Sequence, residues 1–169
     1  MTISPARRAA YEVVLRVFEQ DAYADRAFTG AAEGLEPRDR ALAQKIAYGT
    51  VQRVRTLDHA IDALGRRPVR KLDPPVRAAL RLGAYQLGFL EVAPHAAANE
   101  SVELVRRAGL HRAVAFTNAV MRRLAEGIVP FLAELGEDTP RSSTPIPTGS
   151  PRPGGTSSAP RMRSRCCAS

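Results

Sequence analysis

The sequence predicts an all-α fold, and three observations carry this prediction. Apolar residues recur at helical spacing through most of the first 127 residues. The stretch 76–90 is apolar nearly all round, which is typical of a helix buried at the centre of a domain. The 169-residue chain is 44% hydrophobic but only 5% aromatic and has no Trp, so its core is built mainly from Ala, Val and Leu. Such small side chains favour closely packed helices.

Helices are expected throughout the first 64 residues. Ser4 is a typical N-cap residue and Pro5 suits the first helical position, where its missing N–H costs nothing. Gly65 and Pro68 then interrupt the helical pattern. The expected helices span residues 5–20, residues 22–33, a segment that begins at Pro37 and includes Val54, and residues 56–64.

The central helix follows a similar start signal, with Asp73 as its N-cap and Pro74 in its first turn. Gly83 and Gly88 would each destabilise an exposed helix by about 1 kcal/mol relative to Ala. They therefore indicate the close approach of a neighbouring helix backbone.

Arg77 and Arg81 are four residues apart and are expected to mark the one exposed edge of the central helix. Fifteen residues that include two arginines are too short and too charged to span a bilayer. Two more helices are expected, over residues 94–109 with Gly109 closing the first, and over residues 111–127.

The chain is strongly basic, with a net charge of +8. Residues 1–135 carry +5 of it and residues 136–169 carry +3. This charge suits a polyanionic partner, and RNA, DNA and acidic membranes all remain open on charge alone. Most of the cations are arginines, whose planar guanidinium groups bind phosphate and stack on bases.

Two clusters of cations are candidates for phosphate contacts. Arg7 and Arg8 lie in a first helical turn, where the helix dipole is already positive, so they are poorly placed for stability and well placed for a phosphate. The loop 66–71 carries four cations and either is simply solvated or contacts phosphate. With the two central-helix arginines added, the residues expected to bind RNA are Arg7, Arg8, Arg66, Arg67, Arg70, Lys71, Arg77 and Arg81.

Neither catalysis nor metal binding is expected from the cysteines. Cys166 and Cys167 are adjacent, form no disulfide framework, and lack both metal-ligand spacing and the surroundings of a catalytic thiol. The N-terminus shows no apolar core of a signal peptide. We therefore expect a cytoplasmic protein without membrane association.

Four segments stand out: DRALAQKIAYGTVQR from Asp39, LDPPVRAALRLGAYQLGFL from Leu72, PHAAANESVELVRRAG from Pro94 and FTNAVMRRLA from Phe116. Together they resemble the NusB-like helical domain that begins 16S ribosomal RNA cytosine-C5 methyltransferases of the RsmB type. The resemblance covers residues 4–126. It implies an RNA-binding bundle of about seven helices, with small-subunit ribosomal RNA as its partner.

An alternative function comes from NusB itself, the transcription antitermination factor, which shares the NE–VEL and F–NAV patterns. That resemblance implies a protein that binds RNA together with a ribosomal protein. The run AYGTVQR, the LRLGAYQL segment and the pair Arg122 and Arg123 favour the methyltransferase branch.

In full-length members of that branch, a methyltransferase domain follows that uses S-adenosylmethionine, a cysteine nucleophile and a glycine-rich cofactor loop. Neither motif occurs in this sequence; Gly154 and Gly155 stand among prolines without a flanking strand or helix. We expect no cofactor in this chain and no activity from it alone. The expected organisation is a NusB-like domain over 4–126, the end of the last helix and a linker over 127–138, and a tail over 139–169.

The tail is rich in Pro, Ser and Arg and contains no acidic residue. It is interpreted either as a disordered basic segment or as the product of a displaced reading frame. Residues 143–149 can be encoded by TCC ACT CCT ATC CCG ACT GGN, and reading from the third base gives His-Ser-Tyr-Pro-Asp-Trp. That phrase resembles the methyltransferase family's entry into the linker before its catalytic domain.

Resequencing of the gene from codon 136 through several hundred bases past the stop tests this hypothesis. We expect the displaced frame to be open and to encode a glycine-rich loop and a Pro-Cys nucleophile motif. A displaced frame that closes within a few codons would contradict it.

Overall fold

The computed structural model describes residues 3–136, and this part of the chain is all α-helical, as predicted. It contains seven α-helices, one short 3₁₀ helix (η1) and no strand. The tail beyond residue 138 and its proposed reading frame lie outside the described residues. The helices are α1 (Pro5–Glu19), α2 (Ala24–Ala31), α3 (Pro37–Gln52), α4 (Val54–Gly65), η1 (Val69–Lys71), α5 (Pro74–Phe89), α6 (Pro94–Arg107) and α7 (His111–Glu134).

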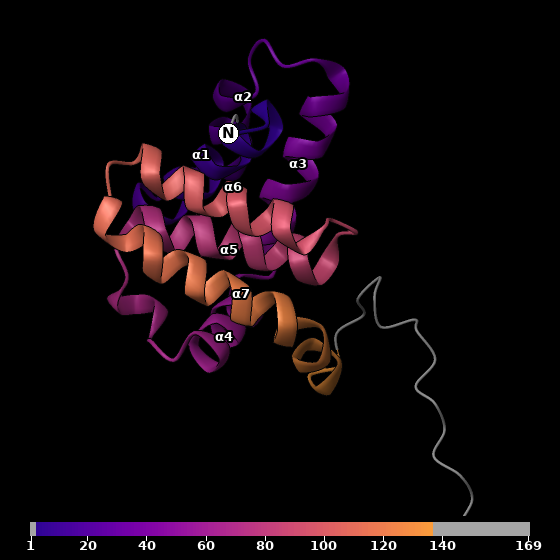
Figure 1. The fold of residues 1–169 in the computed structure, drawn as a ribbon. Helices are drawn as coiled ribbons and strands as arrows, with labels where there is room; N and C mark the ends of the chain where they lie inside the picture. The colour runs from indigo at the N-terminus through magenta and orange to yellow at the C-terminus, as the bar shows by residue number, and fades with distance from the viewer. Residues whose placement is uncertain (1–2, 137–169) are drawn as a thin grey trace, which may run out of the picture.

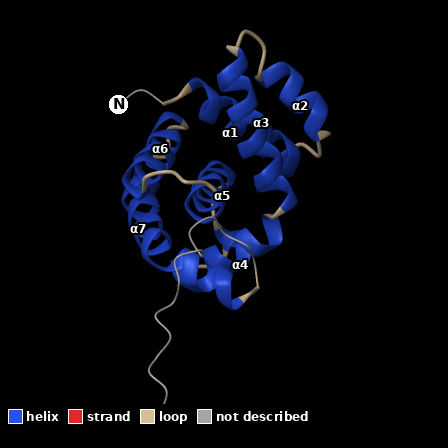
Figure 2. Ribbon diagram, turned by 90° about the vertical axis from the view of Figure 1, so that its right-hand side faces the viewer, coloured by secondary structure: helices blue, strands red, loops and turns tan. Residues whose placement is uncertain are grey.

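Helix α5 lies at the centre and packs against five other helices: α1, α3, α4, α6 and α7. Figure 2 shows it end-on, with α1 to α3 on one side and α6 and α7 on the other. All residues from 78 to 90 are buried. The chain runs from the α1–α3 group through α4 and α5 into the α6–α7 pair (Figure 1). The apolar stretch therefore forms the centre, as the sequence predicts.

Glycines allow the neighbours of α5 to come close. A Cβ atom at Gly83 would lie 2.5 Å from the Met121 Cε and the Ser101 Oγ, and one at Gly88 would lie 2.5 Å from a Leu132 methyl group. On α3, a Cβ at Gly49 would overlap the phenol of Tyr85. Neighbouring helices do come close at Gly83 and Gly88, but the groups that fill the space are side chains of α6 and α7 and not the helix backbone that the sequence predicted.

The prediction that Arg77 and Arg81 mark an exposed edge is wrong. Arg81 is only 8% exposed, and the Arg77 side chain is 19% exposed. The reason is that α1 and α4 cover this edge with acidic side chains, Glu19 and Asp58, which pair with the two arginines.

Two further details differ from expectation at the ends of helices. Asp73 occupies the N-cap position of α5, but its side chain makes no capping hydrogen bond. Helix α7 runs beyond the helical pattern of residues 111–127 and ends at Glu134, within the segment 127–138 expected to hold the end of the last helix, because Ile128 and Leu132 still fall on its buried face. Pro130 lies within this last stretch and is exposed. Among residues 3–136, no helix is both long and apolar enough to cross a membrane.

The substitution Gly49→Ala tests the packing of α3 on α5. We expect it to lower the free energy of unfolding by about 1–3 kcal/mol, because the added methyl group overlaps the Tyr85 ring in a packed interface. Urea denaturation followed by circular dichroism measures the change.

The matched control is Gly30→Ala. A Cβ at this helical glycine meets only an Arg16 nitrogen at 3.5 Å, an ordinary contact. We expect this variant to be neutral or more stable by up to about 1 kcal/mol, because Ala favours the helix more than Gly does. Equal stability of the two variants would contradict the packing argument.

Candidate nucleic-acid interface

The loop between α4 and α5 presents its cations outward because its apolar residues anchor it. Val69 and Leu72 are buried. The Val69 backbone N–H donates to the Asp62 carboxylate at 2.6 Å, which ties the loop to α4. Arg66 takes the left-handed conformation, φ 57°, where α4 ends. The four cations at positions 66, 67, 70 and 71 are all exposed.

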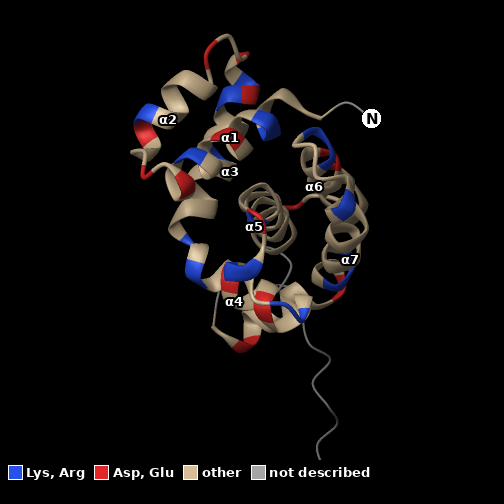
Figure 3. Ribbon diagram, turned by 90° about the vertical axis from the view of Figure 1, so that its left-hand side faces the viewer, with Lys and Arg blue, Asp and Glu red and all other residues tan. Residues whose placement is uncertain are grey.

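The start of α7 adds a fifth cation, Arg112, to this end of the molecule. A groove of about 320 Å³ lies between the loop and α7, and Arg67, Lys71 and Arg112 line it. Leu72, Val76 and Phe116 also line it. We define the basic end face as the cations Arg66, Arg67, Arg70, Lys71 and Arg112. Figure 3 looks onto this end of the molecule, with α5 seen end-on.

An aromatic ring lies beside these cations. The Arg67 guanidinium carbon is 5.5 Å from the centroid of the half-buried Phe116 ring. Such cation–π contacts stabilise a guanidinium group without neutralising its charge. Arg67 therefore stays available to an anion while its position is restrained.

The acidic side chains near the basic end face neutralise little of its charge. Asp73 also lines the groove, with an oxygen 3.9 Å from an Arg112 nitrogen. Their side chains are 49% and 82% exposed, so this pair contributes little stability. Arg106 and Arg107 end α6, and both pair with Glu103. Three cations and one carboxylate line the groove, so the groove is positive overall and fits a phosphate.

The structure separates the predicted RNA-binding residues into two groups. The four loop cations lie together on the basic end face, and Arg8 is exposed at the start of α1. Arg7, Arg77 and Arg81 instead pair with acidic side chains of other helices.

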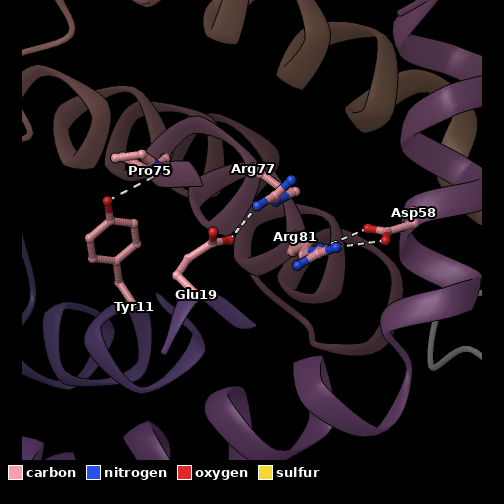
Figure 4. Close-up of polar contacts among 6 residues, drawn as sticks. All are labelled: Tyr11, Glu19, Asp58, Pro75, Arg77 and Arg81. Atoms are coloured by element: carbon pink, nitrogen blue, oxygen red, sulfur yellow. Dashed lines mark hydrogen bonds and ion pairs between the residues drawn. The ribbon is translucent and has the colours of Figure 1, made fainter. Parts of the chain in front are cut away.

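Arg81 is the most buried of the paired arginines. Its Nε and Nη2 atoms donate to the two carboxylate oxygens of Asp58, each at 2.7 Å (Figure 4). Its guanidinium carbon also lies 4.5 Å from the centroid of the Phe18 ring on α1. A single side chain thus connects α1, α4 and α5.

Two more contacts join α1 to α5 at this interface. Arg77 pairs with Glu19 (Figure 4). The Tyr11 hydroxyl donates to the Pro75 carbonyl at 3.5 Å. Burial raises the pKa of Tyr11 to about 12.

Arg7 fastens the beginning of α1 to α5 and α6. Its Nε atom lies 2.5 Å from the Gln86 Oε1 and 2.6 Å from a Glu100 carboxylate oxygen. Burial raises the pKa of the Glu100 carboxyl above its ordinary value, and the Arg7 charge opposes that shift. Binding a phosphate with Arg7 would leave this half-buried carboxylate without its partner.

Arg112 and Phe116 were not among the predicted site residues. They follow the cationic loop by more than forty residues and lie on α7, so no local pattern connects them with it. Phe116 begins the FTNAVMRRLA segment, which was the one available signal. Within residues 3–136, no three His, Cys, Asp or Glu side chains group as a metal site requires.

Comparison with known proteins agrees with the fold. The model of the NusB family matches residues 4–126. The chain belongs to the NusB family. The predicted family resemblance is thereby confirmed.

Relatives within the NusB family carry two kinds of name. A probable ribosomal RNA small subunit methyltransferase B of Synechocystis is 37% identical over 121 residues, which cover 70% of this chain and 27% of that protein. The transcription antitermination protein NusB of Halorhodospira halophila is 39% identical over 107 residues, which cover 63% of this chain and 69% of that protein. The chain thus spans about a quarter of the methyltransferase and about two thirds of the antitermination protein.

Solved structures show the same fold. A crystal structure of the antitermination factors NusB and NusE in complex with double-stranded RNA includes a chain that superposes with a TM-score of 0.68. The match covers 73% of this chain and 95% of that one, at 24% identity. NusB of T. maritima superposes with a TM-score of 0.66.

The substitution Arg81→Ala tests the structural role of this arginine. We expect the free energy of unfolding to fall by about 2–4 kcal/mol, because Asp58 loses its bidentate partner and Phe18 loses its covering group. Chemical denaturation measures it. The control Arg112→Ala, at an 82% exposed side chain, should change stability by less than about 0.5 kcal/mol. An equally small effect of Arg81→Ala would contradict the assignment.

Proposed function

We propose that this chain is an RNA-binding domain that holds small-subunit ribosomal RNA on its basic end face. The observation that carries the proposal is the convergence of Arg67, Lys71 and Arg112 on one groove, with Arg66 and Arg70 exposed in the same loop. Phosphate contacts of this kind supply affinity and position the RNA but carry no sequence information.

The loop's attachment to the core supports this use. Buried Val69 and Leu72 and the bond to Asp62 restrain the backbone that carries the cations. A restrained site loses less conformational entropy on binding than a free loop does. Arg8, exposed at the start of α1, is a further candidate contact, whereas Arg7, Arg77 and Arg81 are assigned to the protein's own stability.

Within the family, we propose the branch named for small-subunit ribosomal RNA methyltransferases. The 37% identity over 121 residues to the Synechocystis protein supports this choice. Because the aligned segment covers 27% of that relative, the part of the function assigned to this chain is RNA binding. Methyl transfer, and S-adenosylmethionine with it, would require a domain beyond the aligned segment.

Antitermination is the second candidate function. The 39% identity to the NusB of Halorhodospira halophila, of which the aligned segment covers 69%, favours it. Under this alternative, the chain binds a transcription leader RNA together with a ribosomal protein.

Reversing the charge of two groove cations tests the first function. We expect Arg67→Glu with Lys71→Glu to weaken binding of the full chain to small-subunit ribosomal RNA fragments. The slope of log affinity against log salt concentration should become shallower by roughly 0.7–0.9 for each phosphate that the variant no longer neutralises. Fluorescence anisotropy over a salt series measures both quantities.

The control pair is Arg38→Glu with Arg55→Glu, which changes the net charge equally on exposed residues near the starts of α3 and α4. Equal effects of the two pairs would show a general charge effect and contradict the assigned face. Tighter binding to a leader RNA plus a ribosomal protein than to small-subunit RNA would favour antitermination.

A further inference from the structure

A second groove lies between α3 and α5, formed by residues that do not belong to the basic end face. Its volume is about 470 Å³, and it is an open groove, not an enclosed cavity. The residues that line it are Ala41, Gln44, Lys45, Tyr48, Gly49, Gln52 and Tyr85. We call it the tyrosine groove.

Gly49 leaves the Tyr85 hydroxyl accessible to this groove. A Cβ atom at position 49 would overlap the phenol oxygen and its carbon, so any other residue there would cover the hydroxyl or displace the ring. The rest of Tyr85 is buried, and its ring stacks on Phe89 with centroids 5.5 Å apart. Burial raises the pKa of Tyr85, and nearby Arg53 opposes the shift. The hydroxyl is therefore a rigidly placed, protonated group.

This hydroxyl has no hydrogen-bond partner among residues 3–136. Tyr48, the other phenol of the groove, differs because its hydroxyl donates to Asp25 on α2. A phenol oxygen can both donate and accept. Tyr85 thus offers the tyrosine groove an unused donor and acceptor on a fixed ring.

The rim supplies groups that complement the edge of a base. Gln44 and Gln52 lie two turns apart on α3, on either side of Tyr48, and both are exposed. Each amide offers donors and an acceptor. Lys45 is the one cation that lines the groove, and no carboxylate lines it. Neutral hydrogen-bonding groups, phenol rings and a single ammonium match a base and one phosphate better than an apolar or an acidic peptide.

We propose that the tyrosine groove binds one unstacked base of single-stranded RNA. The Tyr85 hydroxyl and the Gln44 and Gln52 amides contact the polar edge of the base, and Lys45 contacts the adjoining phosphate. Sequence-specific RNA recognition commonly uses bases that are splayed out of single strands in this way. The inference rests on the proposed function and adds base recognition to the phosphate binding of the basic end face.

Three substitutions test the proposal in the full chain: Tyr85→Phe, Gln44→Ala and Gln52→Ala. The probes are fluorescent ten-nucleotide RNAs of U, A or C and an abasic strand of equal length and charge. We expect each variant to bind at least one of the three homopolymers about 2- to 10-fold more weakly than the unsubstituted chain, the loss of one neutral hydrogen bond. We expect the three variants and the unsubstituted chain to bind the abasic strand with equal affinity.

The control is Gln20→Ala, an exposed glutamine that follows α1 and does not line the groove. The affinities of Gln20→Ala for the RNA strands should equal those of the unsubstituted chain. A separate check, thermal denaturation, should show that Tyr85→Phe remains folded. Tyr85→Phe keeps the ring that packs on Phe89, so it removes little besides the hydroxyl.

Three outcomes would overturn the proposal. Groove variants that bind the homopolymers normally would exclude a base contact, and variants weakened equally on the abasic strand would indicate a backbone contact alone. Normal RNA binding with a reduced affinity for a ribosomal protein would make the groove a protein-docking site. Failure of the proposed function is distinguishable, since the unsubstituted chain would then bind none of the strands at low salt.

Discussion

The burial of α5 from residue 78 to its end is the constraint on which the rest of the structure depends. A helix that is apolar nearly all round must be covered on every side, and five other helices do so. Small residues set how closely those helices lie, since Gly83 and Gly88 receive side chains of α6 and α7 directly on the α5 backbone. The positions of the neighbouring helices, and therefore of every surface between them, follow from this packing.

Among residues 3–136, several cations are covered and paired with carboxylates of other helices, whereas the cations of the loop before α5 are exposed. Three arginines pair with a carboxylate on another helix: Arg77 joins α5 to α1, Arg7 joins α1 to α6, and Arg81 joins α5 to α4. The loop before α5 receives no such covering helix, and its cations stay exposed. Four exposed cations therefore lie together where the helix packing ends.

The sequence was sufficient to predict the helices, whose spacing and starts are local patterns. Helical spacing, proline starts and the glycines of α5 predicted the helices and the central one among them. It was not sufficient for Arg81, because its partner Asp58 lies 23 residues earlier on another helix. For the same reason the sequence did not show that Arg112 and Phe116 lie beside the cationic loop. Nor did it show that Gly49 contacts Tyr85. Each of these pairs is created by tertiary packing.

The anchoring of the loop before α5 also affects how an RNA would associate. Val69 and Leu72 are inserted in the core and the Val69 amide is bonded to Asp62, so the spacing between cations is set before any ligand arrives. In such an encounter the polynucleotide, rather than the protein, undergoes most of the conformational adjustment. Flexible single strands would then adapt to the domain more readily than stiff duplexes do.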